Sequence, residues 1–178
     1  MSAFDPDADL SGDIAFRLMA ASFVRLFRQP ALLEQSIGWL LDHDYQVVRL
    51  DASGWTREEN LHTAIAQALD FPDYYGRNLD ALNDCLSDVA AFEYGARRDA
   101  TGLVVVFTGY DKFVAHCPHG AQATLDIFAD QARGAALFGH RMCCLVQSDD
   151  PNIRFEPVGA MPVLWNDAEW LDSKRHPD

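Results

Sequence analysis

Basic residues are scarce in this sequence, which also lacks a membrane-length apolar stretch. It carries 14 Lys and Arg against 27 Asp and Glu, a formal net charge of −13. Phosphate contacts need a basic surface, so direct binding to nucleic acid is disfavoured. No apolar stretch approaches the roughly 18 residues of a membrane helix, and we expect no membrane partner. The opening segment, MSAFDPDADLSGD, has four Asp and no basic residue, the opposite of a secretory signal, so we expect a cytoplasmic protein.

The motifs of several common catalytic and nucleotide-binding sites are also missing. Neither G-x-G-x-x-G nor G-x-x-x-x-G-K-[ST] occurs, which argues against the common nucleotide-binding folds. There is no G-x-S-x-G nucleophile elbow of a hydrolase. The four cysteines, Cys85, Cys117, Cys143 and Cys144, form no C-x-x-C pair, so we interpret them as buried free thiols and not as a disulfide framework.

Possible metal ligands are present but irregularly spaced. The segment AHCPHG holds His116, Cys117 and His119, and His140 follows further along the chain. Structural zinc sites have firmer spacing, so a loop before a helix is the favoured interpretation. A small metal-dependent enzyme that uses these residues, or the aspartates described below, stays open as an alternative.

Helical and strand patterns alternate along the chain. Its 178 residues, 49% of them apolar, can fill the core of one compact domain. Two near-continuous apolar stretches, 102–109 and 141–148, are typical of strands buried on both faces of a parallel sheet. Further strands are expected at 22–27 and 45–52, with short candidates at 153–157 and 161–165, and helices at 31–44, 78–89 and 120–139. Another helix is expected after Thr56, as an N-cap that forms a capping box with Glu59. The pattern predicts an α/β fold with a small, mostly parallel sheet packed by helices.

The stretch FPDYYGRNLDALNDCL, residues 71–86, combines a turn with an acidic helix. Asn78 is a good N-cap, and we expect Gly76 to take the turn conformation before it. Between Asp70 and Asp88 there are five Asp and one Arg, a local net charge of −4. At about 100° per residue, the helix has an apolar side and an acidic side. The apolar side consists of Leu79, Leu82, Leu86 and Val89. The acidic side consists of Asp80, Asp84 and Asp88.

Asp80 and Asp84 lie one helical turn apart, and four explanations compete for them. A solvated helix face is the usual one, and the helix dipole also accounts for Asp80 in the first turn. Asp84 is a poor helix former that repels its neighbour, so local physics mildly disfavours it. A catalytic pair lacks a nearby histidine, and a metal site lacks ligands. A docking face for a basic partner fits best, with Tyr74 and Tyr75 beside the carboxylates.

These residues resemble the barstar family, intracellular inhibitors of the secreted ribonuclease barnase. The family pattern LPEYYGxNxDALxDCL compares with FPDYYGRNLDALNDCL here, and a weaker similarity extends from Tyr45 to about Gln147. The resemblance implies a small parallel-sheet α/β fold that covers the active site of a basic ribonuclease or ribonuclease-type toxin. Such an inhibitor is not an enzyme and needs no cofactor. A barstar-like module for a basic partner that is not a ribonuclease is the further alternative.

The resemblance also implies roles for individual residues. Asp84 matches the dominant family carboxylate, which enters the phosphate site of the enzyme, and Asp80 matches its partner one turn earlier. Asp130 lies where the family has a second acidic contact, a Glu. The expected partner-binding set is Tyr74, Gly76, Asn78, Asp80, Asn83, Asp84 and Asp130. Asn83 and Val89 depart from the family, which has a Trp of the contact face at each position, so we expect altered partner choice or lower affinity.

Two segments extend beyond the barstar-like part. We divide the chain into an N-terminal extension, residues 1–44, a barstar-like domain, residues 45–148, and a C-terminal extension, residues 149–178. The first extension combines an acidic tail with a β-α unit packed on the same domain. A right-handed crossover would allow this unit to add one more parallel strand to the sheet.

Overall fold

Five parallel strands form the centre of the molecule. The structure, a computed structural model, describes residues 12–176, so most of the acidic tail lies outside the described part. The strands are β1 (Val24–Phe27), β2 (Tyr45–Asp51), β3 (Gly102–Thr108), β4 (Met142–Gln147) and β5 (Leu164–Trp165), in the order β2-β3-β4-β1-β5. Every neighbouring pair is parallel, which confirms the predicted α/β class.

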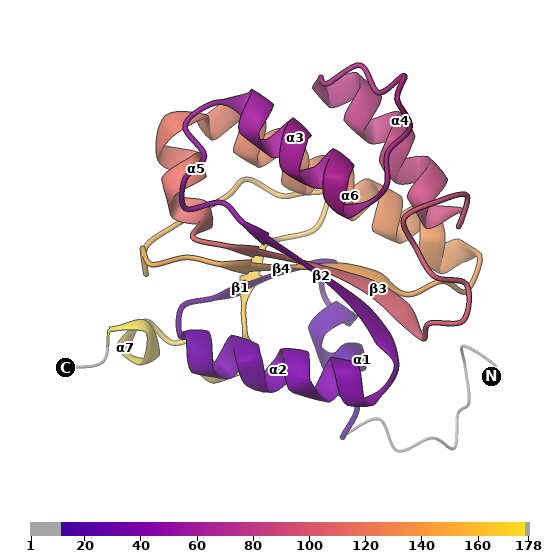
Figure 1. Ribbon diagram of the computed structural model, residues 1–178. Helices are drawn as coiled ribbons and strands as arrows, with labels where there is room; N and C mark the ends of the chain where they lie inside the picture. The colour runs from indigo at the N-terminus through magenta and orange to yellow at the C-terminus, as the bar shows by residue number, and fades with distance from the viewer. Residues whose placement is uncertain (1–11, 177–178) are drawn as a thin grey trace.

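Helices cover both faces of this sheet. They are α1 (Ile14–Met19), α2 (Pro30–Asp42), α3 (Glu58–Ala68), α4 (Leu79–Ala90), α5 (Tyr110–His116), α6 (Pro118–Leu137) and α7 (Asp172–Arg175), with a 3-10 helix η1 (Asp167–Glu169). In Figure 1, α3, α4, α5 and α6 lie on one side of the sheet, and α1 and α2 lie on the other. None of the helices within residues 12–176 has the length and apolar character needed to cross a membrane.

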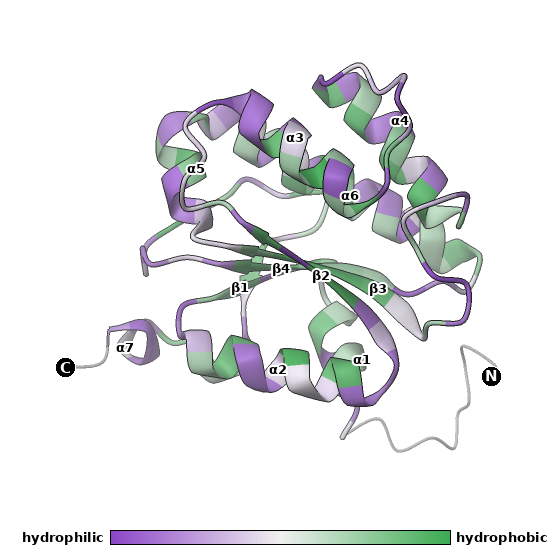
Figure 2. Cartoon of the chain, viewed as in Figure 1, coloured by the Kyte–Doolittle hydropathy of each residue, from purple (hydrophilic) through white to green (hydrophobic). Residues whose placement is uncertain are grey.

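Side chains of the central strands alternate between the two helical layers, as the pleat of a strand requires. In β3, Val105 and Phe107 pack into the core shared with α3, α4, α5 and α6. Val104 and Val106 point the other way, into a second core with α1 and α2. Figure 2 shows the resulting apolar band along the strands between the two layers. Both faces are therefore buried, which explains the continuous apolar runs in the sequence.

The predicted N-terminal β-α unit is present, but its strand does not lie beside the next one in sequence. β1 pairs with β4, with Val24 opposite Cys144, so β4 and β3 separate β1 from β2. The connection from β1 to β2 contains α2, which buries Leu33, Ile37 and Leu40 against the sheet. The extension therefore belongs to the same sheet, while the boundaries that we drew at residues 44 and 148 stay predictions.

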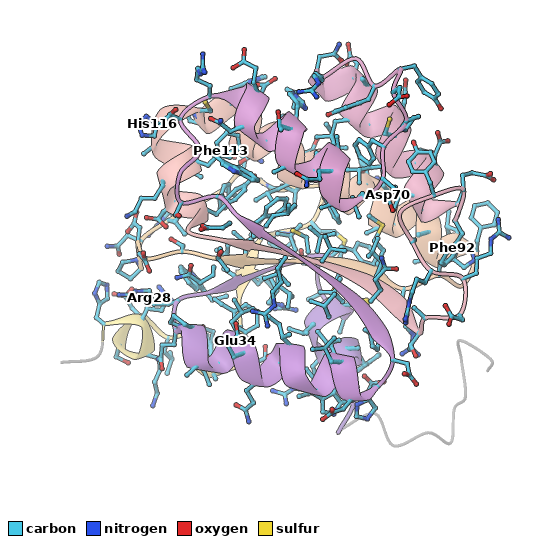
Figure 3. All side chains as sticks on the ribbon, viewed as in Figure 1. Arg28, Glu34, Asp70, Phe92, Phe113 and His116 are labelled. Carbon is cyan, nitrogen blue, oxygen red and sulfur yellow. The ribbon has the colours of Figure 1, made fainter. Side chains whose placement is uncertain are left out.

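The C-terminal extension supplies the edge strand of the sheet next to β1. β5 pairs with β1, which confirms a strand within 161–165, whereas the strand predicted at 153–157 is wrong. Beyond β5, the fully buried Glu169 accepts hydrogen bonds from the backbone N–H groups of Arg28 (3.0 Å) and Gln29 (2.7 Å). These donors lie where α2 begins, and Figure 3 shows Arg28 at this junction with α7. A buried carboxylate thus joins the C-terminal extension to the start of α2 in the N-terminal extension.

Three local predictions need correction. Arg57, not Thr56, is the N-cap of α3, because the Asn60 side-chain oxygen accepts from both backbone N–H groups at 3.0 and 3.1 Å and leaves Glu59 no capping role. The segment AHCPHG is mostly helical and not a loop: it contains the end of α5, the non-helical Cys117 and the first residues of α6, which begins at Pro118. Of the four thiols, Cys117 is only half-buried, and the other three are buried as predicted.

The Glu169 anchor is testable by stability. We expect Glu169→Ala to cost about 2–3 kcal/mol of unfolding free energy, because it leaves two backbone donors at the start of α2 without their charged acceptor. Glu156→Ala is the control, since Glu156 is exposed and its carboxylate makes no hydrogen bond within residues 12–176. Urea denaturation of both variants measures the difference, and equal stabilities would contradict the anchoring role.

Candidate functional site

A buried tyrosine holds the turn between α3 and α4. Tyr75 is 9% exposed, and its ring packs edge-on against Phe71 with ring centroids 4.9 Å apart. Its hydroxyl lies 2.5 Å from Nδ1 of His62, a buried residue of α3. Its neighbour Tyr74 instead lies at the surface and is 77% exposed. The pair of tyrosines therefore divides into an anchor and a surface side chain.

His62 is satisfied on both sides of its ring. Nδ1 meets the Tyr75 hydroxyl, and Nε2 lies 3.2 Å from Oε1 of Glu58. Burial raises the pKa of Tyr75, so its phenol stays neutral and keeps its proton for this contact. A buried hydrogen bond with both partners fixed restricts the turn, so Tyr74 and the start of α4 are held in place.

The turn itself differs from the prediction. Arg77, and not Gly76, takes the left-handed conformation, with φ 51°. At position 76, a Cβ would lie 3.3 Å from both the Ala81 Cβ and the Asn78 Nδ2, a tight approach that would require these side chains to shift slightly. The Arg77 guanidinium donates to the Thr63 hydroxyl at 3.0 Å, so the one basic side chain between residues 70 and 88 is held against α3.

α4 is capped and oriented as predicted. The Asn78 side-chain oxygen accepts a hydrogen bond from the Ala81 backbone N–H at 2.8 Å, which confirms the N-cap. The buried residues of this helix are Leu82, Cys85, Leu86 and Val89. Packing of this side against the core leaves the opposite side, with Asp80 and Asp84, in solvent. Val89 is fully buried, so in this chain its position belongs to the core and not to the contact face.

The two exposed aspartates of α4 have no partner in the described part of the chain. Within residues 12–176, neither Asp80 nor Asp84 makes a salt bridge or accepts a side-chain hydrogen bond, although both are exposed. Asp88, one turn later, is different: it is half-buried and accepts a hydrogen bond from the Tyr94 hydroxyl at 3.2 Å. The acidic side of the helix thus separates into one structural carboxylate and two free ones.

Asn83 faces a neighbouring helix and not only solvent. Its side-chain oxygen accepts from Nε2 of Gln131 at 2.9 Å, and the residue is half-buried. This bond joins α4 to α6, the helix packed beside it (Figure 1). Where the family resemblance has an aromatic contact, this chain has a polar bridge that fixes the acidic helix to its support.

Asp130 is exposed on α6 but is already paired. Its Oδ1 lies 2.5 Å from Nη2 of Arg133, and Nη1 of that arginine donates to the carbonyl oxygen of Gly159. The C-terminal extension thus holds a cation against this carboxylate. The structure brings Tyr74, Gly76, Asn78, Asp80 and Asp84 together in one short segment, with Asn83 partly covered and Asp130 neutralised on the next helix.

Sequence reasoning missed the residues that position this segment. The role of His62 depends on Tyr75, 13 residues away in the chain, and that of Gln131 depends on Asn83, 48 residues away. It also missed two neighbouring apolar side chains at the end of α6, Leu137 and Phe138, which are 83% and 80% exposed. Two adjacent apolar residues do not fit the spacing of a helix that buries one side, and this mismatch is the signal that the sequence offered.

The possible metal ligands are not gathered into one site. His116 and His119 are exposed at the junction of α5 and α6. The His140 ring instead packs on Phe92, with centroids 4.3 Å apart, and Figure 3 shows Phe92 and His116 at opposite ends of the molecule. Across residues 12–176, there is no group of three or more His, Cys, Asp or Glu placed to hold a metal ion. The metal-dependent alternative therefore gains no support from the described residues.

The fold and this segment define an α/β protein that presents free carboxylates and one exposed aromatic ring on a rigid helix and turn. Comparison with known families gives the particular group. A family model described as Barstar (barnase inhibitor) matches residues 45–147, more than half of the chain. The chain belongs to the barstar family.

One curated relative is also similar over a short region. It is the "Putative ribonuclease inhibitor YrdF" of Bacillus subtilis strain 168, with 55% identity over 38 residues. The matched region is 21% of this chain and 42% of that relative, so it spans less than half of the relative's length.

The buried turn anchor gives a matched pair of tests. Tyr75→Phe keeps the ring but removes the hydroxyl, which leaves His62 with an unpaired nitrogen, so we expect a loss of about 1–2 kcal/mol in unfolding free energy. Tyr74→Phe makes the same chemical change on an exposed ring and should stay within about 0.5 kcal/mol of the parent. Urea denaturation decides, and a Tyr75→Phe protein as stable as Tyr74→Phe would refute the anchor.

Proposed function

We propose that this protein inhibits a basic ribonuclease, or a ribonuclease-type toxin, by covering its active site with the turn before α4 and the exposed side of that helix. The observation that carries the proposal is the pair Asp80 and Asp84, exposed one turn apart and without a salt bridge within residues 12–176. Membership of the barstar family supports the ribonuclease as the class of partner. The protein would act as an immunity protein and perform no chemistry itself.

Free carboxylates on a rigid helix can occupy the positions of RNA phosphates. A ribonuclease active site gathers basic side chains for the phosphates of its substrate, and carboxylates form strong charge-assisted hydrogen bonds with such side chains. Asp84 would enter the phosphate site, and Asp80 would contact the basic groups beside it. With Arg77 turned to Thr63, no cation of the turn competes for these carboxylates.

Rigidity lowers the cost of binding. The Asn78 cap, the His62–Tyr75 hydrogen bond and the Asn83–Gln131 bridge each fix part of the contact segment before the partner arrives. A preorganised surface loses less conformational entropy when it binds. This support compensates in part for the small number of aromatic anchors.

The partner is expected to differ from an enzyme that needs several aromatic contacts. Asn83 is engaged with Gln131 and Val89 is in the core, so neither presents a large side chain to a partner. Tyr74 is the exposed aromatic ring of the segment. Binding energy would therefore depend more on charge, and the cognate ribonuclease would offer a groove for one aromatic ring beside its phosphate site.

Inhibition of RNA cleavage tests this proposal directly. Barnase and a panel of other small basic ribonucleases would be titrated with the parent protein and with Asp84→Ala. We expect Asp84→Ala to lose about 2–5 kcal/mol of binding free energy, a range drawn from charge pairs at other interfaces that include the barnase–barstar complex itself, because basic groups of the enzyme stay buried and unpaired.

Asp42→Ala is the matched control. Asp42 is an exposed aspartate of α2, on the opposite side of the sheet, so the control makes the same change in net charge away from the site. Equal inhibition by the two variants would remove the role of Asp84. If the parent protein inhibits none of the enzymes but captures another basic protein through Asp84, the acidic face keeps its binding role and the partner is not a ribonuclease.

Salt gives a second test, on the rate of association. The chain carries a net charge of −13, so a basic enzyme is steered toward it. We expect the association rate constant to fall by about tenfold or more between low and physiological salt, while the dissociation rate constant changes much less, because screening acts on the encounter of the two proteins. Stopped-flow measurements with the inhibited enzyme provide both constants, and a salt-independent association rate would contradict charge steering.

A further inference from the structure

A second polar site lies on the other side of the sheet from α4. A cavity of about 220 Å³ opens between α1, β1, α2 and the segment that leads into η1. Its polar lining is Arg17, Arg25, Gln35, Ser36, Asn166 and Asp167. All of these residues lie outside residues 45–147, the part that matches the family model. The cavity is therefore built by the two extensions together.

Arg25 is a buried cation at an inward position of a central strand. It is 4% exposed and lies between Val24 and Leu26 of β1, which point to the opposite core. Its Nε and Nη2 donate to the carbonyl oxygen of Leu18 at 3.3 and 3.0 Å, and Nη2 also donates to that of Arg17 at 3.1 Å. These contacts tie β1 to the last turn of α1.

One nitrogen of this guanidinium remains unused. Within residues 12–176, Nη1 of Arg25 donates no hydrogen bond, although Arg25 lines the cavity. The structural tie to α1 uses only Nε and Nη2, so it does not account for Nη1. The guanidinium has five N–H donors and always carries its charge, so a residue that lines the cavity keeps donors and a positive charge available to a ligand there.

The charge of Arg25 is incompletely balanced by the protein. Within residues 12–176, it forms no salt bridge. Asp167 acts on it electrostatically, but Oδ2 of Asp167 is bonded to Nη2 of Arg17 at 3.2 Å. Burial of a charge costs free energy unless the charge is paired, and burial lowers the pKa of Arg25. A small anion would supply the missing pairing.

We propose that this cavity binds a small oxyanion, a carboxylate or a phosphate, between Nη1 of Arg25 and the guanidinium of Arg17. Gln35 and Asn166 offer neutral donors at the same cavity, because their side-chain amides make no hydrogen bond within residues 12–176. The volume is below the roughly 300–1,000 Å³ of pockets for drug-sized ligands, so the ligand is small. The site is independent of the acidic face and of the proposed ribonuclease partner.

Thermal unfolding of the full chain with sodium phosphate and sodium acetate, against sodium chloride at matched ionic strength, tests the site. At about ten times the dissociation constant of the bound anion, the melting temperature should rise by about 4 °C, and it should keep rising with the logarithm of the anion concentration. In parallel, the Arg Nε–Hε signals of ¹⁵N-labelled protein are followed by NMR, and the signal of Arg25 should move with the same dissociation constant.

Two variants with opposite expected effects exclude a trivial change in folding. Arg17→Gln removes one cation from an exposed rim position and should weaken binding about tenfold. Asp167→Asn removes the competing carboxylate and should strengthen binding by about threefold or more. The proposal is overturned if neither oxyanion gives a saturable movement of the Arg25 NMR signal, or if the two variants change the affinity in the same direction.

Discussion

A parallel sheet needs cover on both faces, and this requirement organises the whole molecule. The part that matches the barstar family supplies β2, β3 and β4 together with α3, α4, α5 and α6, and all four helices lie on one side. The apolar residues Val104, Val106 and Leu145 on the other side would meet water without α1 and α2. The N-terminal extension is thus part of the core, because it buries a face that the rest of the chain leaves open.

The same arrangement explains why the acidic helix is a rigid surface. α4 packs its apolar side on the core and lies beside α6, so its free side can only face solvent. Polar bridges at Asn83 and Tyr75 then fix its position from two directions. Charge that is left unpaired on such a support is available to a partner, whereas Asp88 accepts a hydrogen bond from Tyr94 and Asp130 forms a surface ion pair with Arg133.

The two extensions also depend on each other. β5 is held by β1, and the buried Glu169 accepts the first backbone donors of α2. The two extensions together bury Arg25. An apolar residue at this position of β1 would bury no charge. The cavity lined by Arg17, Arg25 and Asp167 lies on the opposite side of the sheet from the acidic surface of α4, and the family-matching part contributes none of its lining residues.

What the sequence determined by itself is the local order: the buried strands, the Asn78 cap, and the apolar and acidic sides of α4. Each follows from residues within a few positions of one another, where periodicity and capping act. Only the tertiary structure decided that β1 lies beside β4, that Arg77 takes the strained turn position, and that Val89 is core. The same holds for Asn83 and Asp130, whose availability depends on Gln131 and on Arg133 held by Gly159. Contacts between distant segments set these outcomes, because packing and buried hydrogen bonds outweigh local preference.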